Sequence, residues 1–195
     1  EQKYGNRREI AFEAPHRTSL RVSVAKGRGA TFRGGTVMAA HLSEVAFWKT
    51  VRGQSTAQGA ATSLKNAIPR SAGSAVIIES TANGLGGEFY ELYIKAKQHK
   101  NEFRAMFFPW FAFNEYKLPG RLPDQFYSEA EWLDDEPALK AMGCSDEQLA
   151  WRRWAIAMLC DGDIDAFHQE YPSTDEEAFL TSGRPVFLPS VVNKR

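Results

Sequence analysis

Two apolar runs that each end in polar residues constrain the fold of this chain more than any other feature of its sequence. The first run covers residues 37–44 and the second covers residues 75–83, and in both the polar side chains gather at the carboxyl end. Buried strands of an open α/β sheet have this pattern, because ligands bind beyond the carboxyl ends of such strands. The two runs therefore predict an α/β fold with a ligand crevice where they end.

The rest of the chain predicts a sheet followed by helices. Period-two patterns and helical patterns alternate up to about residue 111, and Pro119, Gly120 and Pro123 then indicate a linker within residues 114–124. The expected elements before that linker are, in order, strands at 8–12 and 20–24, a glycine-rich basic loop at 26–35, the first apolar run, a helix at 53–67, the second apolar run, a helix at 88–97 and a strand at 103–108.

Beyond residue 124 the pattern is helical. Ser145 with Gln148 and Ser173 with Glu176 have the spacing of capping boxes, which predicts a helix start at each serine. One face of the first of these helices is expected to be buried, and its apolar positions are Ala150, Trp151, Trp154, Ala157 and Met158.

Charge and short motifs narrow the class of protein. Residues 1–70 carry 12 Lys and Arg against 4 Asp and Glu, and the remaining residues carry the opposite surplus. A basic half suits phosphates, although the two halves can also neutralise each other in the fold. No apolar run is long enough for a membrane span, and the two cysteines have no metal-site spacing, so we expect a reduced, cytosolic protein.

Several kinds of site are excluded by their motifs. The sequence has no Gly-Lys dipeptide and so no phosphate-binding P-loop, and it has no HExxH or GxSxG pattern. Asp161, Asp163 and Asp165 resemble the start of a calcium loop, but Ala166 and Pro172 stand where that loop needs Gly and Glu. We interpret the three aspartates as a solvated acidic turn.

The end of the first apolar run carries the candidate catalytic acid. A carboxylate at such a strand tip orients the attacking water of a nucleotide hydrolase, and Glu44 has this place. Ser43 stands where an Asp is usual, so it would hold Mg²⁺ weakly or through water. The alternative is that Glu44 only initiates a helix.

Two further groups are candidates for contact with phosphates. Ser80, Thr81 and Asn83 end the second run with hydroxyl and amide groups that can sense a phosphate, although the same residues are common in ordinary turns. Arg28 and Arg33 lie in the basic loop and can meet phosphates or remain solvated.

Taken in order, these segments resemble the large terminase subunit of tailed phages and prophages, the ATPase-nuclease that packages DNA. The resemblance spans nearly the whole chain, and its specificity comes from the order of the segments. They are Arg28-Gly-x-Thr31, His41-Leu-Ser-Glu-Val-Ala-Phe-Trp48, Glu79-Ser-Thr-Ala-Asn-Gly-x-Gly-Gly-x-Phe-Tyr90, Phe108-Pro-Trp-Phe111, Gln169-Glu-Tyr-Pro-Ser-Thr-Asp-Glu-Glu-Ala-Phe179 and Val186-Phe187.

The resemblance implies a role for each candidate residue. Ser43 and Glu44 match the Walker B position, with Glu44 as the catalytic carboxylate for ATP with Mg²⁺. The segment Ser80-Thr-Ala-Asn83 matches the coupling motif, which links hydrolysis to domain movement. Arg28 matches an arginine that reaches the γ-phosphate across a subunit interface.

The resemblance also implies a domain organisation. Residues 1–111 would be the C-terminal half of the ATPase domain, a P-loop NTPase fold of the RecA or terminase type with a mostly parallel sheet and flanking helices. Residues 112–183 would be a small helical linker subdomain, and residues 184–195 would begin the connection to a nuclease. Because the Walker A loop and the nuclease aspartates are missing and the chain begins at Glu1 rather than Met, we expect a fragment that is inactive alone.

The implied partners are double-stranded DNA, a small terminase subunit, a portal protein and further copies of the chain in a ring, in the cytoplasm of a bacterial host and away from membranes. Three alternatives remain open: a helicase-like ATPase fragment, a non-enzymatic prophage remnant, and a DNA-binding module that uses the basic half.

Overall fold

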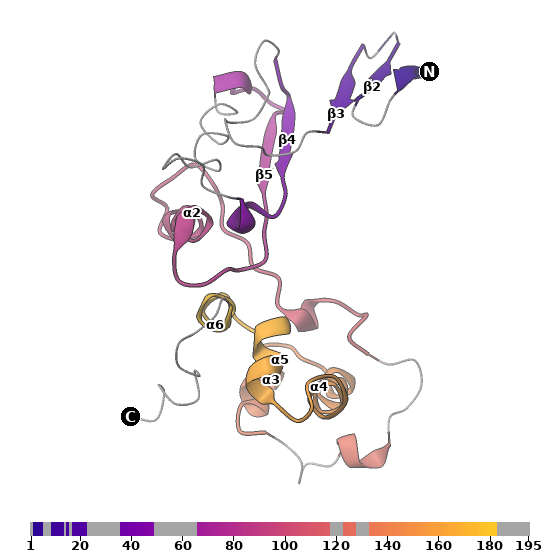
Figure 1. Cartoon of the computed structure of the whole chain (residues 1–195), viewed down its shortest axis with the longest axis vertical. Coiled ribbons are helices and arrows are strands. Elements are labelled where there is room, and N and C mark those ends of the chain that lie inside the picture. The colour runs from indigo at the N-terminus through magenta and orange to yellow at the C-terminus, as the bar shows by residue number, and fades with distance from the viewer. Residues whose placement is uncertain are drawn as a thin grey trace. The chain divides into compact units, whose positions relative to one another are not determined.

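The structure is a computed structural model of the chain, a mixed α/β protein (Figure 1). It describes residues 2–5, 9–13, 15, 17–22, 36–48, 66–117, 123–127 and 133–182. The chain divides into two compact units, Glu1–Ser80 and Thr81–Arg195. The expected functional boundaries near residues 111 and 183 stay predictions, since the two units are defined by packing alone.

The first unit begins with a small antiparallel sheet. Its strands β1 (Gln2–Gly5), β2 (Glu9–Phe12) and β3 (Ser19–Arg21) lie in the order β1-β2-β3. Strands β2 and β3 confirm the two short strands predicted there, whereas β1 was not predicted. Glu9 and Arg21 are directly opposite in the register, and an ion pair of 2.8 Å joins their side chains.

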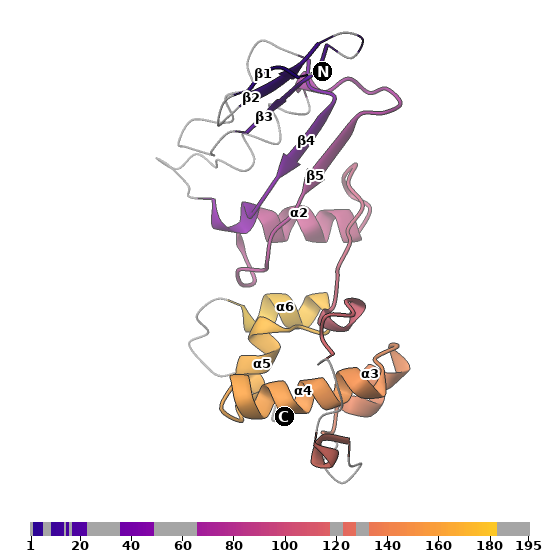
Figure 2. The ribbon, with the colours of Figure 1, turned by 90° about the vertical axis from the view of Figure 1, so that its right-hand side faces the viewer.

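The two apolar runs form a pair of parallel strands, β4 (Ala39–Leu42) and β5 (Ala75–Ile78), which lie side by side in Figure 2. Four residue pairs are in register, from Ala39 opposite Ala75 to Leu42 opposite Ile78. The strands were expected to be buried on both faces, and this part of the prediction is wrong. Burial alternates along β5, where Ile77 is 58% exposed, so one face of the pair is open.

The connection from β4 to β5 is described only at its ends. A short 3-10 helix, η1 (Val45–Phe47), follows β4. The predicted helix over residues 53–67 lies outside the described residues except for Asn66 and Ala67, which are helical.

The second unit begins with the helix α2 (Gly87–Lys97), which confirms the helix predicted over residues 88–97. The turn before it uses Gly84 and Gly87 at φ 80° and 78°, a conformation that a side chain disfavours. The strand predicted over residues 103–108 is wrong. These residues alternate between half-buried and exposed as a strand would, but they form no strand in the described structure because no ladder pairs with them.

The rest of the second unit is helical, as predicted, and its helices pack on an aromatic core. The ring centroids of Trp110 and Trp151 lie 5.5 Å apart. Phe167 is fully buried beside them, and the partly buried Tyr171 packs against it. None of the helices in the described residues is long and apolar enough to cross a membrane. The helical elements are η2 (Trp110–Ala112), η3 (Asp124–Tyr127), α3 (Glu136–Ala141), α4 (Asp146–Leu159), α5 (Ile164–Glu170) and α6 (Asp175–Thr181).

The start of α4 is the capping box that the sequence predicts. The Ser145 hydroxyl accepts a hydrogen bond from the Gln148 amide, and the Gln148 side chain accepts one from the Ser145 amide at 3.0 Å. Asp163 caps α5 through two backbone amides, which gives the predicted acidic turn a structural role.

The capping box predicted at Ser173 and Glu176 is wrong by one residue. Thr174 is the residue that caps α6, and its hydroxyl accepts from the Glu177 amide. The Ser173 amide instead donates to the Glu177 carboxylate, and the Ser173 hydroxyl accepts from the indole nitrogen of Trp110.

The buried face of α4 also differs from its prediction. Trp151 is buried as expected, but Ala157 and Met158 are exposed. Arg152 and Arg153 are buried in their place. The helix therefore places two charges where the apolar pattern predicts none, and these charges need partners from other elements.

Candidate functional site

The carboxyl ends of β4 and β5 form the strand-end site, which we define as Ser43, Glu44, Glu79 and Ser80. The parallel register continues past both strands, since the Glu79 amide donates to the Leu42 carbonyl at 2.9 Å. The chain after β4 then crosses to β5, because the Val45 amide donates to the Glu79 carbonyl at 3.2 Å. The polar ends of the two apolar runs therefore meet at one edge, as the sequence predicts.

Glu44 has an unusual backbone conformation at this edge. Its φ and ψ are 54° and 41°, in the left-handed region, which costs a residue with a side chain about 1–2 kcal/mol. It precedes η1, but its side chain makes no capping hydrogen bond. Glu44 is thus at the N-cap position of η1, so the alternative that it initiates a helix stays open, and the residue is exposed at the strand end.

Ser43 and Ser80 differ in how their polar atoms are used. The carbonyl of Ser43 accepts from the indole nitrogen of Trp48 at 3.0 Å, and the residue is exposed. The hydroxyl of Ser80 accepts from the Ala46 amide at 3.1 Å, so it links the end of β5 to the turn after β4. Trp48 is a contributor to this site whose role sequence reasoning did not anticipate, because the contact depends on a turn conformation that the sequence does not reveal.

A second polar pair lies beside the turn. The Nε2 atom of His41 is 3.3 Å from a carboxylate oxygen of Glu79, and both side chains are substantially exposed. An ion pair in such a position contributes little to stability. It does place the second carboxylate of the edge next to an imidazole.

The strand-end site fits Mg²⁺ only in a limited way. Mg²⁺ in nucleotide sites takes one or two carboxylates and fills its remaining positions with phosphate oxygens and water. Glu44 and the hydroxyl of Ser43 match that minimal set. Among the described residues no cluster of three or more His, Cys, Asp or Glu could hold a metal alone.

The other predicted site residues do not belong to the described residues of the first unit. Thr81 and Asn83 are exposed residues of the second unit, ahead of α2. Arg28 and Arg33 lie within residues 23–35, outside the described residues.

The segment that follows Asn83 is tied to α6 by the α2–α6 joint, which we define as Tyr93, Lys97, Asp175 and Phe179. Asp175 accepts hydrogen bonds from the Tyr93 hydroxyl at 2.8 Å and from the Lys97 ammonium at 2.7 Å. Phe179 of α6 packs against three rings of α2, and its centroid lies 5.4 Å from that of Tyr93.

The charge of Asp175 is stabilised within this joint. Burial raises the pKa of Asp175, but its hydrogen bonds with Glu176, Lys97 and Tyr93 outweigh this effect and lower the pKa to about 2. The pKa of Tyr93 is raised, first by burial and then by its hydrogen bond to Asp175. The joint therefore depends on an ionised Asp175 at neutral pH.

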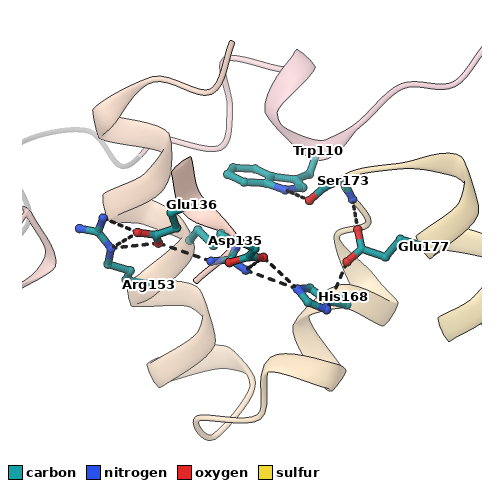
Figure 3. Close-up of polar contacts among 8 residues, drawn as sticks. Trp110, Asp135, Glu136, Arg153, His168, Ser173 and Glu177 are labelled. Carbon is teal, nitrogen blue, oxygen red and sulfur yellow. Dashed lines mark hydrogen bonds and ion pairs between the residues drawn. The ribbon is translucent and has the colours of Figure 1, made fainter. Parts of the chain in front are cut away.

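The most extensive polar cluster of the described structure lies inside the helical part (Figure 3). Glu136 is fully buried and binds the guanidinium of Arg153 through three hydrogen bonds of 2.6–3.0 Å. Arg152, also fully buried, reaches Glu136 and Asp135. We call the set Asp135, Glu136, Arg152, Arg153, His168 and Glu177 the ion cluster.

His168 joins the ion cluster to α6. Its Nδ1 atom lies 3.2 Å from Glu177, and its Nε2 atom lies 3.3 Å from Arg152 and 3.6 Å from Asp135. Although burial raises the pKa of Asp135, the hydrogen bond with His168 and the charge of Arg152 give a net lowering. Since Glu136 and Arg152 are fully buried and paired with each other, the cluster organises the helices.

The comparisons with known proteins add no family to these observations. A scan against models of protein families, a search of curated proteins and a search of solved structures each returned no match for this chain.

Proposed function

We propose that this chain is part of a DNA-packaging ATPase of the terminase large-subunit type, with a P-loop NTPase fold whose sheet includes β4 and β5. The observation that carries the proposal is the strand-end site. It presents the exposed carboxylate of Glu44, a residue with a left-handed backbone, at the carboxyl ends of two parallel strands. The ordered resemblance of the flanking segments supports the same class.

In this proposal Glu44 orients and polarises the water that attacks the terminal phosphate of ATP. Bound Mg²⁺ would supply charge neutralisation on the phosphates. Ser43 would hold the ion through its hydroxyl or through water, and the carboxylate of Glu44, the next residue in the chain, would assist it. The sequence lacks a phosphate-binding loop. The chain therefore supplies the residues that orient the attacking water, and it is expected not to bind ATP tightly alone.

Thr81 and Asn83 would pass the state of the terminal phosphate to α2. The α2–α6 joint gives this signal a physical route within the second unit, because Asp175 and Phe179 tie α2 to the last described helix. Arg28 would stabilise negative charge on the phosphates, a role that falls on residues outside the described structure.

The proposed setting follows from the family. The complete motor would act on double-stranded DNA in the cytoplasm of a bacterial host, as a ring of identical subunits on a portal protein, with a small terminase subunit that selects the DNA.

The experiment is ATP hydrolysis by the complete gene product that contains this sequence, with Mg²⁺ and with or without double-stranded DNA. We expect Glu44→Gln to lower turnover by about 100-fold or more, the contribution of a positioned general base. The matched control is Glu91→Gln, which changes an exposed carboxylate of α2 that pairs only weakly with Lys95. Wild-type turnover in Glu44→Gln would remove this residue from the mechanism, and absence of any hydrolysis by the wild type would contradict the proposal.

A non-enzymatic module is the second candidate, and one observation favours it. Ser43 leaves the strand-end site with a single carboxylate at the end of β4, so the chain can retain the fold without strong metal binding. The same hydrolysis assay decides between the two candidates.

A further inference from the structure

Two side chains hold the turn that carries Glu44. The indole nitrogen of Trp48 donates to the Ser43 carbonyl at 3.0 Å, on the amino side of Glu44. The Ser80 hydroxyl accepts from the Ala46 amide at 3.1 Å, on the carboxyl side. The two hydrogen bonds therefore enclose Glu44 and Val45, and Glu44 is the residue with the left-handed backbone.

The turn combines these two side-chain bonds with bonds of its own backbone. Beyond the register of β4 and β5, the Val45 amide donates to the Glu79 carbonyl, and η1 is closed by bonds from the Phe47 amide to the Glu44 carbonyl and from the Trp48 amide to the Val45 carbonyl. A left-handed residue with a side chain persists only where its surroundings determine it. Loss of either side-chain bond would free one flank of Glu44 to relax toward an ordinary conformation.

We propose that Trp48 and Ser80 are positioning residues that fix the carboxylate of Glu44 for the attack of water. This inference rests on the proposed function. It gives Ser80 a task at the backbone of the neighbouring strand end rather than at a phosphate, and it assigns a task to Trp48. Neither residue needs to touch the nucleotide, since each acts on Glu44 through the backbone of the turn.

The proposal makes a kinetic distinction. A positioning defect lowers the rate of the chemical step but leaves nucleotide binding unchanged, so kcat falls while KM for ATP does not. A residue that contacts the phosphates in both the ground state and the transition state would raise KM instead. Misplacement of a reacting group by about 1 Å can cost roughly 100-fold in rate.

The test uses the complete gene product and the variants Trp48→Phe, Ser80→Ala and Ser80→Thr. We expect the first two to lower kcat by about 10-fold or more with KM within about twofold of wild type, and Ser80→Thr to restore turnover because it keeps the hydroxyl. Ser74→Ala is the matched control. Ser74 closes a turn with Pro69 and Ser71 at the opposite end of β5, so its loss removes similar hydrogen bonds away from Glu44.

A second readout follows the turn itself. The backbone chemical shifts of Glu44 report a left-handed residue, and we expect this signature to weaken in Trp48→Phe and Ser80→Ala but to persist in Ser74→Ala. Turnover close to wild type in both variants, or a raised KM with unchanged kcat, would overturn the positioning roles while leaving the ATPase intact. A wild-type protein that does not hydrolyse ATP would overturn the proposed function, and the positioning roles with it.

Discussion

The strand-end site and the ion cluster use charge in opposite ways. At the strand-end site, Glu44 is exposed and has a strained backbone. In the ion cluster, Glu136 and Arg152 are fully buried, and hydrogen bonds link them to neighbouring charges. An exposed carboxylate in a strained conformation is available for chemistry, whereas a buried and paired one serves packing.

The largest expected effect tests the buried side of this comparison. Glu136→Ala leaves buried Arg153 without its main carboxylate partner and removes one of the two carboxylates that Arg152 contacts, so we expect a loss of about 3–5 kcal/mol in the free energy of unfolding, measured by urea denaturation. The control is Asp146→Ala, which breaks the exposed ion pair with Lys140 and is expected to cost about 1 kcal/mol or less. Similar losses in the two variants would mean that the ion cluster is no more important than a surface pair.

A smaller effect is expected from pH at the α2–α6 joint. The pKa of Asp175 is held at about 2, below its ordinary value, so its ionised form stabilises the folded state above about pH 4. This contribution is lost as the pH falls from about 4 to about 2, since Asp175 then takes up a proton. Urea denaturation across that range should show the loss in the wild type and a weaker dependence in Asp175→Asn, where Asp135 still contributes in the same direction. An equal dependence in both proteins would exclude Asp175 as a cause.

The smallest effect has the opposite sign. Glu44→Gly relieves a left-handed residue, so we expect the free energy of unfolding to rise by up to about 1 kcal/mol while hydrolysis by the complete gene product is lost. His99→Gly is the matched control, because His99 has nearly the same φ of 55° after the end of α2. It should gain similar stability without loss of turnover. A destabilised Glu44→Gly would show that the turn is not strained.

Local signals in the sequence were sufficient for some of these elements. The capping box of Ser145 follows from a pattern whose physical cause lies within a few residues, and the two apolar runs were sufficient to predict strands at β4 and β5. The meeting of Ser43 and Glu44 with Ser80 at one edge follows from the parallel register.

Other elements depend on partners that the sequence does not specify. Residues 103–108 have a strand-like alternation, but a strand exists only with a neighbour to pair with. The cap of α6 lies at Thr174 because Ser173 is already engaged by Glu177 and Trp110. The burial of Arg152 and Arg153 requires Asp135 and Glu136, which lie at the start of α3.

The hydrogen bond between the Gly84 amide and the Ser182 hydroxyl, 2.9 Å long, has a mechanical consequence. Gly84 and Ser182 lie near the first and last described residues of the second unit. The residues of the α2–α6 joint all lie between these two positions in the sequence. A tensile load applied at residues 84 and 182 would therefore be carried first across this contact, in parallel with the helices between. The aromatic core around Trp110 and Trp151 would be shielded from the pull until that short link had ruptured.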